Sequence, residues 1–344
     1  MSRPSSETTM SAIADAVSSL LGGEVAAGDL IPLPAKGVAH DHWHVKGQDV
    51  VVRLPRLTAF DLGSEANIAY QQAAFERARA SGMVPRLAGA CAPSPDLPRG
   101  VLVVERLEGR PPRLPDDLPA IARALARVHA LPVPELAARP PLVEHSDALG
   151  GTLEVVRANL RYAGAAGLSA EGLAEIEEEL GELERSAAGL PPQPVTLVLT
   201  DTHPGNFLIG DDGSARFTDV EKALYGSPAI DLAHATLPTS LNWDPDVTGE
   251  ATPGDVRDFH AVWRSAVPAV LADALAPWIV PMRRLTWVRT SAFLMRWLVA
   301  SAGEGDWSAS RLGAHAARHF EAHARACLRP ETMRRIRREW LAVE

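Results

Sequence analysis

The stretch LTDTHPGNFLIGDDGSARFTDVEKALYGSPAIDLAHA, residues 199–235, sets two acids and an amide at the ends of short apolar segments. Asp201 and Asn206 are five positions apart, between the apolar runs VTLVL and FLI. Asp219 follows a third segment, ARFT. A carboxylate can accept the proton of a hydroxyl, and Mg²⁺ prefers carboxylate and amide oxygens. The spacing therefore predicts a phosphoryl-transfer loop with Asp201 as the base and Asn206 and Asp219 at a metal ion.

A simple turn is the alternative explanation for the same residues. Asp, Gly and Asn are common turn formers, and the Pro204–Gly205 step allows a sharp turn without any chemistry. The order of the whole stretch favours the catalytic interpretation. An apolar strand, DTHPGN, a second strand, TDVE and GSPAIDLA follow one another without interruption.

This ordered string resembles the family of aminoglycoside phosphotransferases and choline-kinase-like small-molecule kinases. Its members carry a His-Gly-Asp-Leu-His-Pro-Gly-Asn loop, an Ile-Asp-Trp-Glu segment and a Gly-Asp-Pro-x-x-Asp-Leu-Ala stretch. The resemblance implies an α+β, protein-kinase-like fold with a small β-rich N-lobe and a larger, mainly helical C-lobe. It also implies that ATP or GTP binds with Mg²⁺, that Asp201 is the catalytic base, and that Asn206 and Asp219 are the magnesium ligands.

Other positions of the motif carry weaker implications. Asp231, in PAIDLA, matches an acid that braces the loop, and His203 shapes the loop rather than reacting. Glu221 either contacts water around the metal or only hydrogen-bonds the fold. The chain departs from the family at Leu199, where the family has a histidine that supports the loop, two residues before the base.

The first part of the chain is rich in predicted strands. Alternating and β-branched runs, with turn residues between them, are typical of hairpins, and an apolar stripe at helical spacing is typical of a helix. We expect a helix at 10–21, a hairpin at 37–55, a helix at 58–80, and strands at 84–90 and 101–107.

A proline-rich segment, LEGRPPRLPDD, separates this part from a predominantly helical remainder. Apolar residues at helical spacing predict helices at 116–131 and 173–190, before the strands that flank Asp201. We therefore expect an N-terminal nucleotide-binding lobe at 1–106. A helical C-terminal lobe with the catalytic loop and the acceptor site is expected at 107–344.

Phosphate groups need a cation from the first lobe, and the sequence contains no GxxxxGK[ST] motif to supply one. Arg53, in VVVRLP, lies where the resemblance implies Lys or Arg, and a guanidinium holds phosphate in a bidentate manner. Lys46 is the rival, in a predicted turn. Glu65 is the first choice of partner for Arg53, and Glu76 is the second. The alternative is a surface arginine on an edge strand.

The segment VVERLEG, at the end of the first lobe, resembles the hinge of the family. There the adenine ring hydrogen-bonds backbone groups, which the resemblance places at Glu105, Arg106 and Leu107. The loop that should cover the phosphates is poor in small residues, with only Gly37 before a bulky stretch.

Two groups of histidines have spacings compatible with a transition-metal site. One group follows strand periodicity and the other follows helix periodicity, so each shares one face of its element. Packing or surface positions are the alternative and the more common case. The groups are His40, His42 and His44, and His315, His319 and His323.

The acceptor site should lie in the helical lobe, beyond Asp201. The segment TSLNWDPD offers Trp243, Asp244 and Asp246, and the acidic helix at 171–185 adds further carboxylates. Such acids suit an amine-bearing sugar or a quaternary amine, and a tryptophan face attracts a cation. A solvated acidic face and an ordinary packed tryptophan are the alternative.

Composition narrows the function classes. A net charge of −9 over 344 residues argues against broad nucleic-acid binding and is compatible with a cationic small substrate. The two cysteines form no metal or disulfide pattern, and no secretory signal or membrane span is visible. We expect a cytoplasmic monomer or homodimer.

Three functions agree with these observations. The first is an ATP-dependent kinase of a small hydroxylated molecule, such as an antibiotic of the aminoglycoside or a related class. The second is a metabolite kinase acting on an amino alcohol or a sugar. The third is a nucleotide-binding pseudokinase that acts as a scaffold, which Leu199 and the glycine-poor loop favour.

Overall fold

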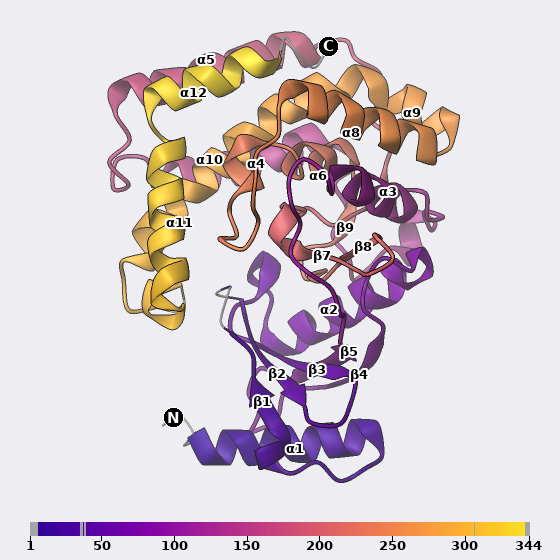
Figure 1. Ribbon diagram of the computed structural model, residues 1–344. Helices are drawn as coiled ribbons and strands as arrows, with labels where there is room; N and C mark the ends of the chain where they lie inside the picture. Colours follow the sequence, from indigo (N-terminus) through magenta and orange to yellow (C-terminus); the bar gives the residue numbers. More distant parts are fainter. Residues whose placement is uncertain (1–5, 35–36, 38, 306, 341–344) are drawn as a thin grey trace.

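A five-stranded antiparallel sheet with the strand order β1-β2-β3-β5-β4 forms the centre of the small lobe (Figure 1). The computed structural model describes residues 6–34, 37, 39–305 and 307–340. The hairpin expected at 37–55 is present as β2 and β3, and residue 38 lies outside the described residues. The strands are β1 (Leu30–Pro32), β2 (His40–Val45), β3 (Val50–Pro55), β4 (Leu87–Cys91) and β5 (Val101–Glu105).

Alternation along β5 divides the small lobe into two apolar layers. Val101 and Val103 pack in a cluster with helix α1 (Ser6–Leu21), which covers one face of the sheet (Figure 1). Leu102 and Val104 belong to the other core cluster, which includes helix α2 and continues into the large lobe. Successive side chains of a strand point to opposite faces, so one apolar run serves both layers.

Helix α2 (Ser64–Ala78) lies between the sheet and the large lobe and buries Ile68 and Phe75, as their spacing predicts (Figure 1). It begins later than the residue 58 expected from the sequence. Phe60 and Asp61 have φ angles of 56° and 52°, in the left-handed region that an α-helix of L-residues does not use. The segment before Ser64 is therefore a separate short turn.

The large lobe is mainly helical, with two small antiparallel β-pairs at the side facing the small lobe (Figure 1). Strand β6 pairs with β9, and β7 pairs with β8. The elements are α3 (Leu118–His129), α4 (Ala148–Leu160), α5 (Ala170–Ala187), β6 (Thr196–Val198), β7 (Phe207–Ile209), β8 (Ala215–Phe217), β9 (Leu224–Gly226), α6 (Ala229–His234), α7 (Pro238–Leu241), α8 (Pro253–Ala266), α9 (Ala269–Leu275), α10 (Ile279–Ser301), α11 (Ala314–Cys327) and α12 (Pro330–Glu339).

Helix α10 is the centre of the large lobe. It packs against α4, α5, α6 and α11, and it buries side chains around most of its circumference. A helix that contacts neighbours on all sides loses the one-sided apolar stripe of a surface helix. Its position lets α10 support α6, which carries residues of the candidate site.

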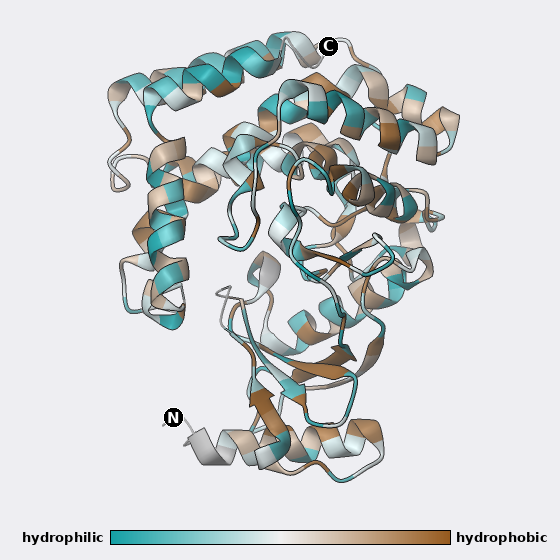
Figure 2. Cartoon of the chain, viewed as in Figure 1, coloured by the Kyte–Doolittle hydropathy of each residue, from teal (hydrophilic) through white to brown (hydrophobic). Residues whose placement is uncertain are grey.

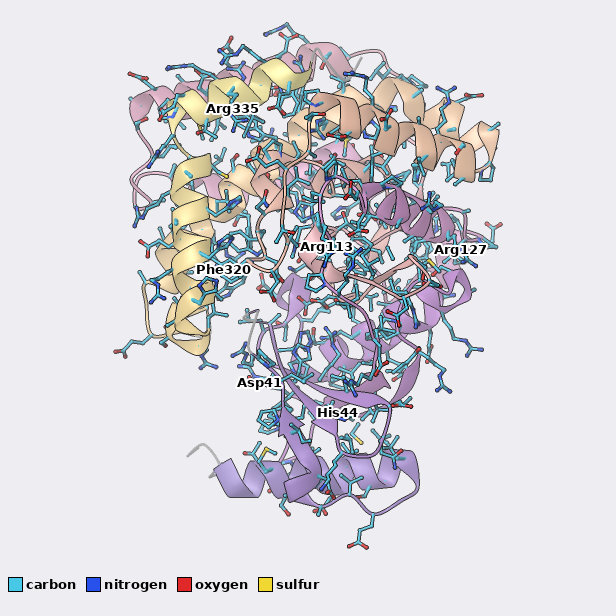
Figure 3. The ribbon with its side chains drawn as sticks, viewed as in Figure 1. Asp41, His44, Arg113, Arg127, Phe320 and Arg335 are labelled. Atoms are coloured by element: carbon cyan, nitrogen blue, oxygen red, sulfur yellow. The ribbon has the colours of Figure 1, made fainter. Side chains whose placement is uncertain are left out.

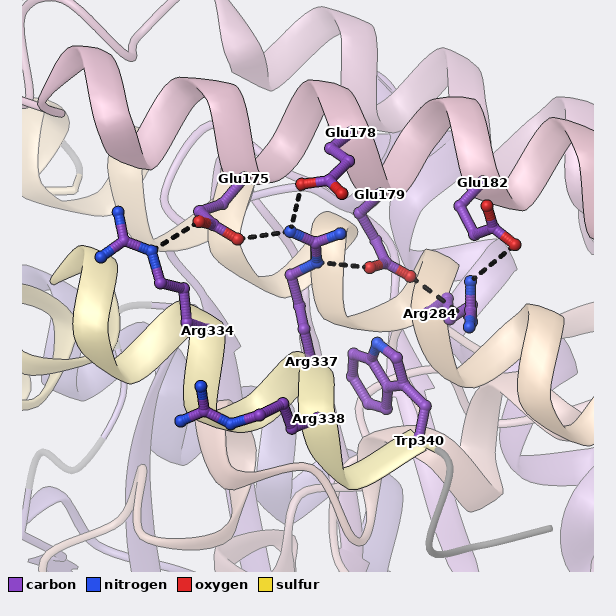
Figure 4. A pocket seen from close by; sticks show the side chains of 9 residues that line it. All are labelled: Glu175, Glu178, Glu179, Glu182, Arg284, Arg334, Arg337, Arg338 and Trp340. Carbon is purple, nitrogen blue, oxygen red and sulfur yellow. Dashed lines mark hydrogen bonds and ion pairs between the residues drawn. The ribbon is translucent and has the colours of Figure 1, made fainter.

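Helix α12 is held against α5 by ion pairs (Figure 4). Arg337 contacts Glu175, lies 2.9 Å from Glu178 and lies 2.7 Å from Glu179. The same seam lines a surface pocket of about 380 Å³, and Figure 2 shows both helices as predominantly hydrophilic. Charge pairing therefore attaches the C-terminal helix along this seam.

Across residues 6–34, 37, 39–305 and 307–340, no helix is both long enough and apolar enough to cross a membrane.

Candidate active site

Asp201 lies in a turn between β6 and β7 whose backbone is strained at the preceding residue. Thr200 has a φ angle of 60°, which is costly for a β-branched residue. The side-chain amide of Asn206 donates to the backbone carbonyl of Asp201 over 2.7 Å. The carbonyl of Asn206 in turn accepts hydrogen bonds from the backbone amide and the hydroxyl of Thr218. These bonds join the loop to the segment that carries Asp219.

Asp231 holds the strained turn through hydrogen bonds to its backbone. Its carboxylate accepts the backbone amides of Leu199 and Thr200 over 2.8 and 2.7 Å. It also lies 3.0 Å from Nε2 of His129, whose Nδ1 accepts the indole N–H of Trp263. Because Nδ1 accepts, Nε2 carries the proton and donates to Asp231.

The hydrogen bonds of Asp231 explain how the loop is supported although Leu199 replaces the histidine of the family. The side chain of Leu199 is buried and apolar, and its backbone amide donates to Asp231. His129 from α3 supplies a buried imidazole to the same carboxylate. The loop therefore has its support without a histidine at position 199.

Lys222 is the nearest cation to Asp201 and was not singled out by the sequence. Its ammonium lies 2.6 Å from Oδ2 of Asp201 and 3.8 Å from Oε1 of Glu221. Burial opposes the charge of Asp201, but the ammonium of Lys222 outweighs it and holds the pKa of Asp201 well below its ordinary value. The clue in the sequence is the lysine three residues after Asp219, in a chain that has few lysines.

Arg53 reaches across from the small lobe to Asp219. Its guanidinium lies 2.6 Å from Oδ1 of Asp219 and donates to the carbonyl of Thr218 over 2.9 Å. Arg53 is buried on β3, which lies between β2 and β5, so the alternative of a surface arginine on an edge strand is wrong. Lys46 is exposed in the turn before β3.

The expected pairing of Arg53 with an acid on α2 is wrong. Glu65 is exposed, and Glu76 accepts a hydrogen bond from Gln72 on the same helix. The contact from α2 comes instead from Gln71, whose amide oxygen lies 3.1 Å from Nε2 of His40. A histidine of β2 thus stands between the helix and the arginine.

His40 connects Gln71 to the acids of the site. Its Nδ1 lies 3.5 Å from a guanidinium nitrogen of Arg53 and 3.3 Å from Oε2 of Glu221. Burial and then the charge of Asp219 raise the pKa of Glu221 to about 8. Burial and then the charge of Arg53 lower the pKa of His40 well below its ordinary value. Nδ1 of the neutral His40 imidazole can therefore accept a hydrogen bond from the protonated carboxyl group of Glu221.

The three histidines of β2 do not come together at one possible metal site. His40 forms a cluster with Asp219 and Glu221, whose ligand atoms all lie within 4.8 Å of one another. His44 lies instead 3.4 Å from the carbonyl of Val50, and Figure 3 shows it on the sheet. His42 is half-buried and lies opposite Arg53 of the adjacent strand β3.

The helical group of histidines is engaged in packing. His319 and His323 lie 2.8 and 3.1 Å from the carbonyls of Asn242 and Thr239, and their rings stack with centroids 6.2 Å apart. His315 is exposed. These contacts favour the packing interpretation over a metal site.

The hinge has one backbone group without an internal partner. The amides of Glu105 and Arg106 donate to the carbonyls of Arg86 and Asp49. Within the described residues, the amide of Leu107 donates to none. The side chain of Glu105 lies 2.9 Å from Arg216. Beside the hinge, a hollow of about 510 Å³ is lined by Glu108, Gly109, Arg110, Ile209, Gly210, Asp211 and Gly213.

The expected acceptor residues separate into two environments. Trp243 stacks on Phe320 of α11, with ring centroids 4.5 Å apart, and meets Trp297 edge-on. Asp246 is exposed, whereas Asp244 is buried against the catalytic loop. A Cβ at Gly205 would meet Cβ of Asp244 at 2.2 Å, so glycine is needed there. Of the three, Asp244 is next to the loop, and Trp243 is part of an aromatic cluster.

The comparisons with known proteins agree with this geometry. A model described as the phosphotransferase enzyme family matches residues 31–269. A choline/ethanolamine kinase family protein from Mesorhizobium loti is 17% identical with a TM-score of 0.56, covering 96% of this chain and 99% of that chain. No curated protein matches the chain.

Two antibiotic phosphotransferases have similar structures. The macrolide 2′-phosphotransferase from Brachybacterium faecium is 16% identical with a TM-score of 0.55, covering 92% of this chain and 97% of that chain. A spectinomycin phosphotransferase, solved with ADP and spectinomycin, is 12% identical with a TM-score of 0.54, covering 85% and 89%. Identities this low show the fold, which is α+β and protein-kinase-like with a small β-rich and a larger helical lobe, as predicted.

Proposed function

The chain belongs to the phosphotransferase enzyme family, and on that basis we propose that it transfers the terminal phosphoryl group of ATP or GTP to a hydroxyl of a small molecule. Residues 1–106 form the nucleotide-binding lobe in this proposal. Residues 107–344 carry the catalytic loop and the acceptor site. The resemblance and the geometry support the same assignment of residues.

The observation that carries the proposal is the pairing of two acids with two cations where the lobes meet. Lys222 faces Asp201, and Arg53 of the small lobe faces Asp219. Phosphate oxygens would reach both cations, because Glu221 connects the two pairs: it lies 3.8 Å from the ammonium of Lys222 and in one cluster with Asp219. If the loop around Asp201 were only a structural turn, there would be no reason for both lobes to bring charged side chains to it.

Asp201 acts as the base in this proposal. The acceptor oxygen forms a bond to the terminal phosphorus, the bond from that phosphorus to the bridging oxygen breaks, and the nucleoside diphosphate leaves. The hydroxyl proton passes to Asp201. Lys222 keeps the carboxylate charged until then and neutralises the transferred group.

The donors around Asp219 fit a magnesium ion. Asp219 and Glu221 contribute carboxylates within a cluster whose ligand atoms are at most 4.8 Å apart. Asn206 is attached to the same segment through Thr218. Oxygen ligands suit Mg²⁺, so Asp219 and Asn206 would hold the ion, which would supply positive charge to the nucleotide phosphates.

The nucleotide assignment rests on the hinge and on Arg53. Within the described residues the backbone amide of Leu107 has no acceptor, so it is suited to donate a hydrogen bond to the adenine ring, next to Glu105 and Arg106. Arg53 is the cation for the phosphates, held by Asp219 and the carbonyl of Thr218 rather than by Glu65. A similar phosphotransferase was solved with ADP, which supports a nucleotide at this site.

The acceptor is an antibiotic of the aminoglycoside or a related class in the first version of the proposal. The likeness to macrolide and spectinomycin phosphotransferases supports it. The likeness to a choline/ethanolamine kinase family protein supports the second version, a kinase of an amino alcohol or a similar metabolite. Asp244, buried beside the loop, suits the amine that both acceptor classes share.

Phosphate transfer from labelled ATP to a panel of aminoglycosides, macrolides, spectinomycin, choline and ethanolamine tests the proposal. We expect labelled product from at least one class, and protection of a sensitive host separates drug from metabolite. Asp201→Asn should lower turnover roughly 10²- to 10⁴-fold. Asp258→Asn, an exposed acid on α8, is the control. Binding of ATP without any consumption would favour the pseudokinase scaffold.

A further inference from the structure

The two carboxylate oxygens of Asp201 have different surroundings. Oδ2 is 2.6 Å from the ammonium of Lys222 and accepts its hydrogen bond. In the part of the chain that the structure describes, no hydrogen bond is directed to Oδ1. This oxygen is therefore the one that can accept a proton from a bound hydroxyl.

His234, at the end of α6, faces that oxygen. Its Nδ1 lies 3.9 Å from Oδ1 of Asp201, and the residue is only 8% exposed. Nδ1 is buried and has no hydrogen-bond partner within the described residues. An orphaned buried polar atom is costly in a folded protein, so it needs a partner that the chain alone does not provide.

The separation of the two atoms fits one shared oxygen atom. A hydroxyl oxygen about 2.8 Å from each of them spans a 3.9 Å gap, and 2.8 Å is an ordinary hydrogen-bond length. Nδ1 of His203 is also buried without a hydrogen-bond partner in the described part of the chain, but only His234 has a ring nitrogen within 4.0 Å of the Asp201 carboxylate. The remaining charged neighbours, Lys222 and Arg289, engage Asp201 and the carbonyl of Thr200.

We propose that His234 holds the acceptor hydroxyl against Asp201 by donating a hydrogen bond from Nδ1 to the hydroxyl oxygen. This inference rests on the proposed function. The hydroxyl donates its own proton to Oδ1 of Asp201, and one lone pair of its oxygen remains for the terminal phosphorus. His234 keeps its proton throughout, while Asp201 receives the proton of the hydroxyl.

The charge state of His234 agrees with this role. Burial lowers its pKa well below the ordinary value, despite the nearby charge of Asp201. A neutral imidazole has one N–H, which lets it donate without adding a positive charge beside Lys222. The arrangement selects a neutral hydroxyl over a carboxylate or phosphate acceptor, because Asp201 repels an anion.

Three substitutions at position 234 test the inference. His234→Asn places an amide nitrogen close to the position of Nδ1, whereas His234→Gln places it farther along the side chain, and His234→Ala removes the donor. The probes are water, as the acceptor in ATP hydrolysis, and any alcohol phosphorylated by the wild-type chain. His260→Asn, a half-buried histidine on α8, is the control.

We expect His234→Ala and His234→Gln to lower kcat roughly 10- to 100-fold, the loss of one positioning hydrogen bond, with the KM for ATP unchanged. His234→Asn should recover most of the activity. Wild-type rates in His234→Ala, or equal losses in the Ala and Asn variants, would overturn the inference alone. A wild-type chain that consumes no ATP with any acceptor would overturn it together with the proposed function.

Discussion

The ammonium of Lys222 lies 2.6 Å from the carboxylate of Asp201, so the chain itself supplies a cation to the candidate base. The pair lies beside Glu221, whose Oε1 is 3.8 Å from the same ammonium. Burial lowers the pKa of Lys222, but the charge of Asp201 outweighs this effect and raises the pKa above its ordinary value. Lys222 therefore remains charged, and its role in turnover can be tested separately from that of the base.

Lys222→Gln should lower kcat roughly 10- to 10³-fold, because it removes a positive charge from the place where the phosphoryl group is transferred. Lys222→Arg should retain more activity, since it keeps the charge. Lys222 also lowers the pKa of Asp201, so its loss should move the acid limb of the kcat profile to higher pH. Steady-state kinetics from pH 9 down to the lowest pH at which the protein stays folded measure both effects, because the pKa of Asp201 lies below its ordinary value in the wild type. An unchanged profile with full activity would exclude the role.

Asp219→Ala should abolish the magnesium-dependent part of nucleotide binding, because Asp219 is the carboxylate assigned to the ion. Calorimetric titration with ATP, with and without Mg²⁺, measures this directly. Asp258→Ala, on the exposed face of α8, is the matched control. Tight magnesium-dependent binding by Asp219→Ala would contradict the assignment.

Asp231→Ala should destabilise the protein by about 3–5 kcal/mol, since it leaves buried donors without an acceptor. Asp231 is fully buried and accepts from Leu199, Thr200 and His129. Urea unfolding of the wild type and the variant measures the difference. A loss below about 1 kcal/mol would show that the turn is held by other contacts.

His260 should contribute to acid sensitivity. Burial, and then the charge of Arg283, lower its pKa to about 3 in the folded state. The ordinary value for the unfolded chain is about 6.5. Below that pH the unfolded chain binds a proton that the folded chain does not, so the free energy of unfolding decreases as the pH falls from 6.5 towards 3.

His260→Gln removes this contribution. Between pH 7 and pH 5, we expect the variant to lose about 1–2 kcal/mol less stability than the wild type. Urea unfolding at the two pH values measures the difference. His315→Gln, at an exposed histidine of α11, is the control. An identical loss in the wild type and in His260→Gln would contradict the burial effect.

The parts of the fold that local patterns encode were predictable. An alternating run predicted β2, a β-branched run predicted β3, and apolar residues at helical spacing predicted α3 and α5. The three-residue strands β1 and β9 were missed, because so short a run has no period to detect. The start of α2 was placed too early, since left-handed angles at Phe60 and Asp61 depend on packing as well as on residue type.

In the candidate site too, the residues that share a local motif were predictable, whereas the contacts between distant segments were not. Asp201, Asn206 and Asp219 were found from their spacing, and their roles remain predictions. The predicted partner of Arg53 is wrong, because charge favours an acid on α2, whereas the helix contributes Gln71, whose amide oxygen accepts a hydrogen bond from Nε2 of His40. Lys222 was missed although its position three residues after Asp219 offered a clue, and His234 was missed because nothing in its sequence context distinguishes it from a packing residue.

By itself, the sequence determined the loop around Asp201, the family and the division into a strand-rich and a helical part, because each is encoded by neighbours along the chain. Only the tertiary structure decided which cation faces which acid. Arg53 and Asp219 are 166 positions apart, and His129 and Asp231 are 102 positions apart. Electrostatic contacts depend on distance in space, and that distance is set only when the lobes and helices pack.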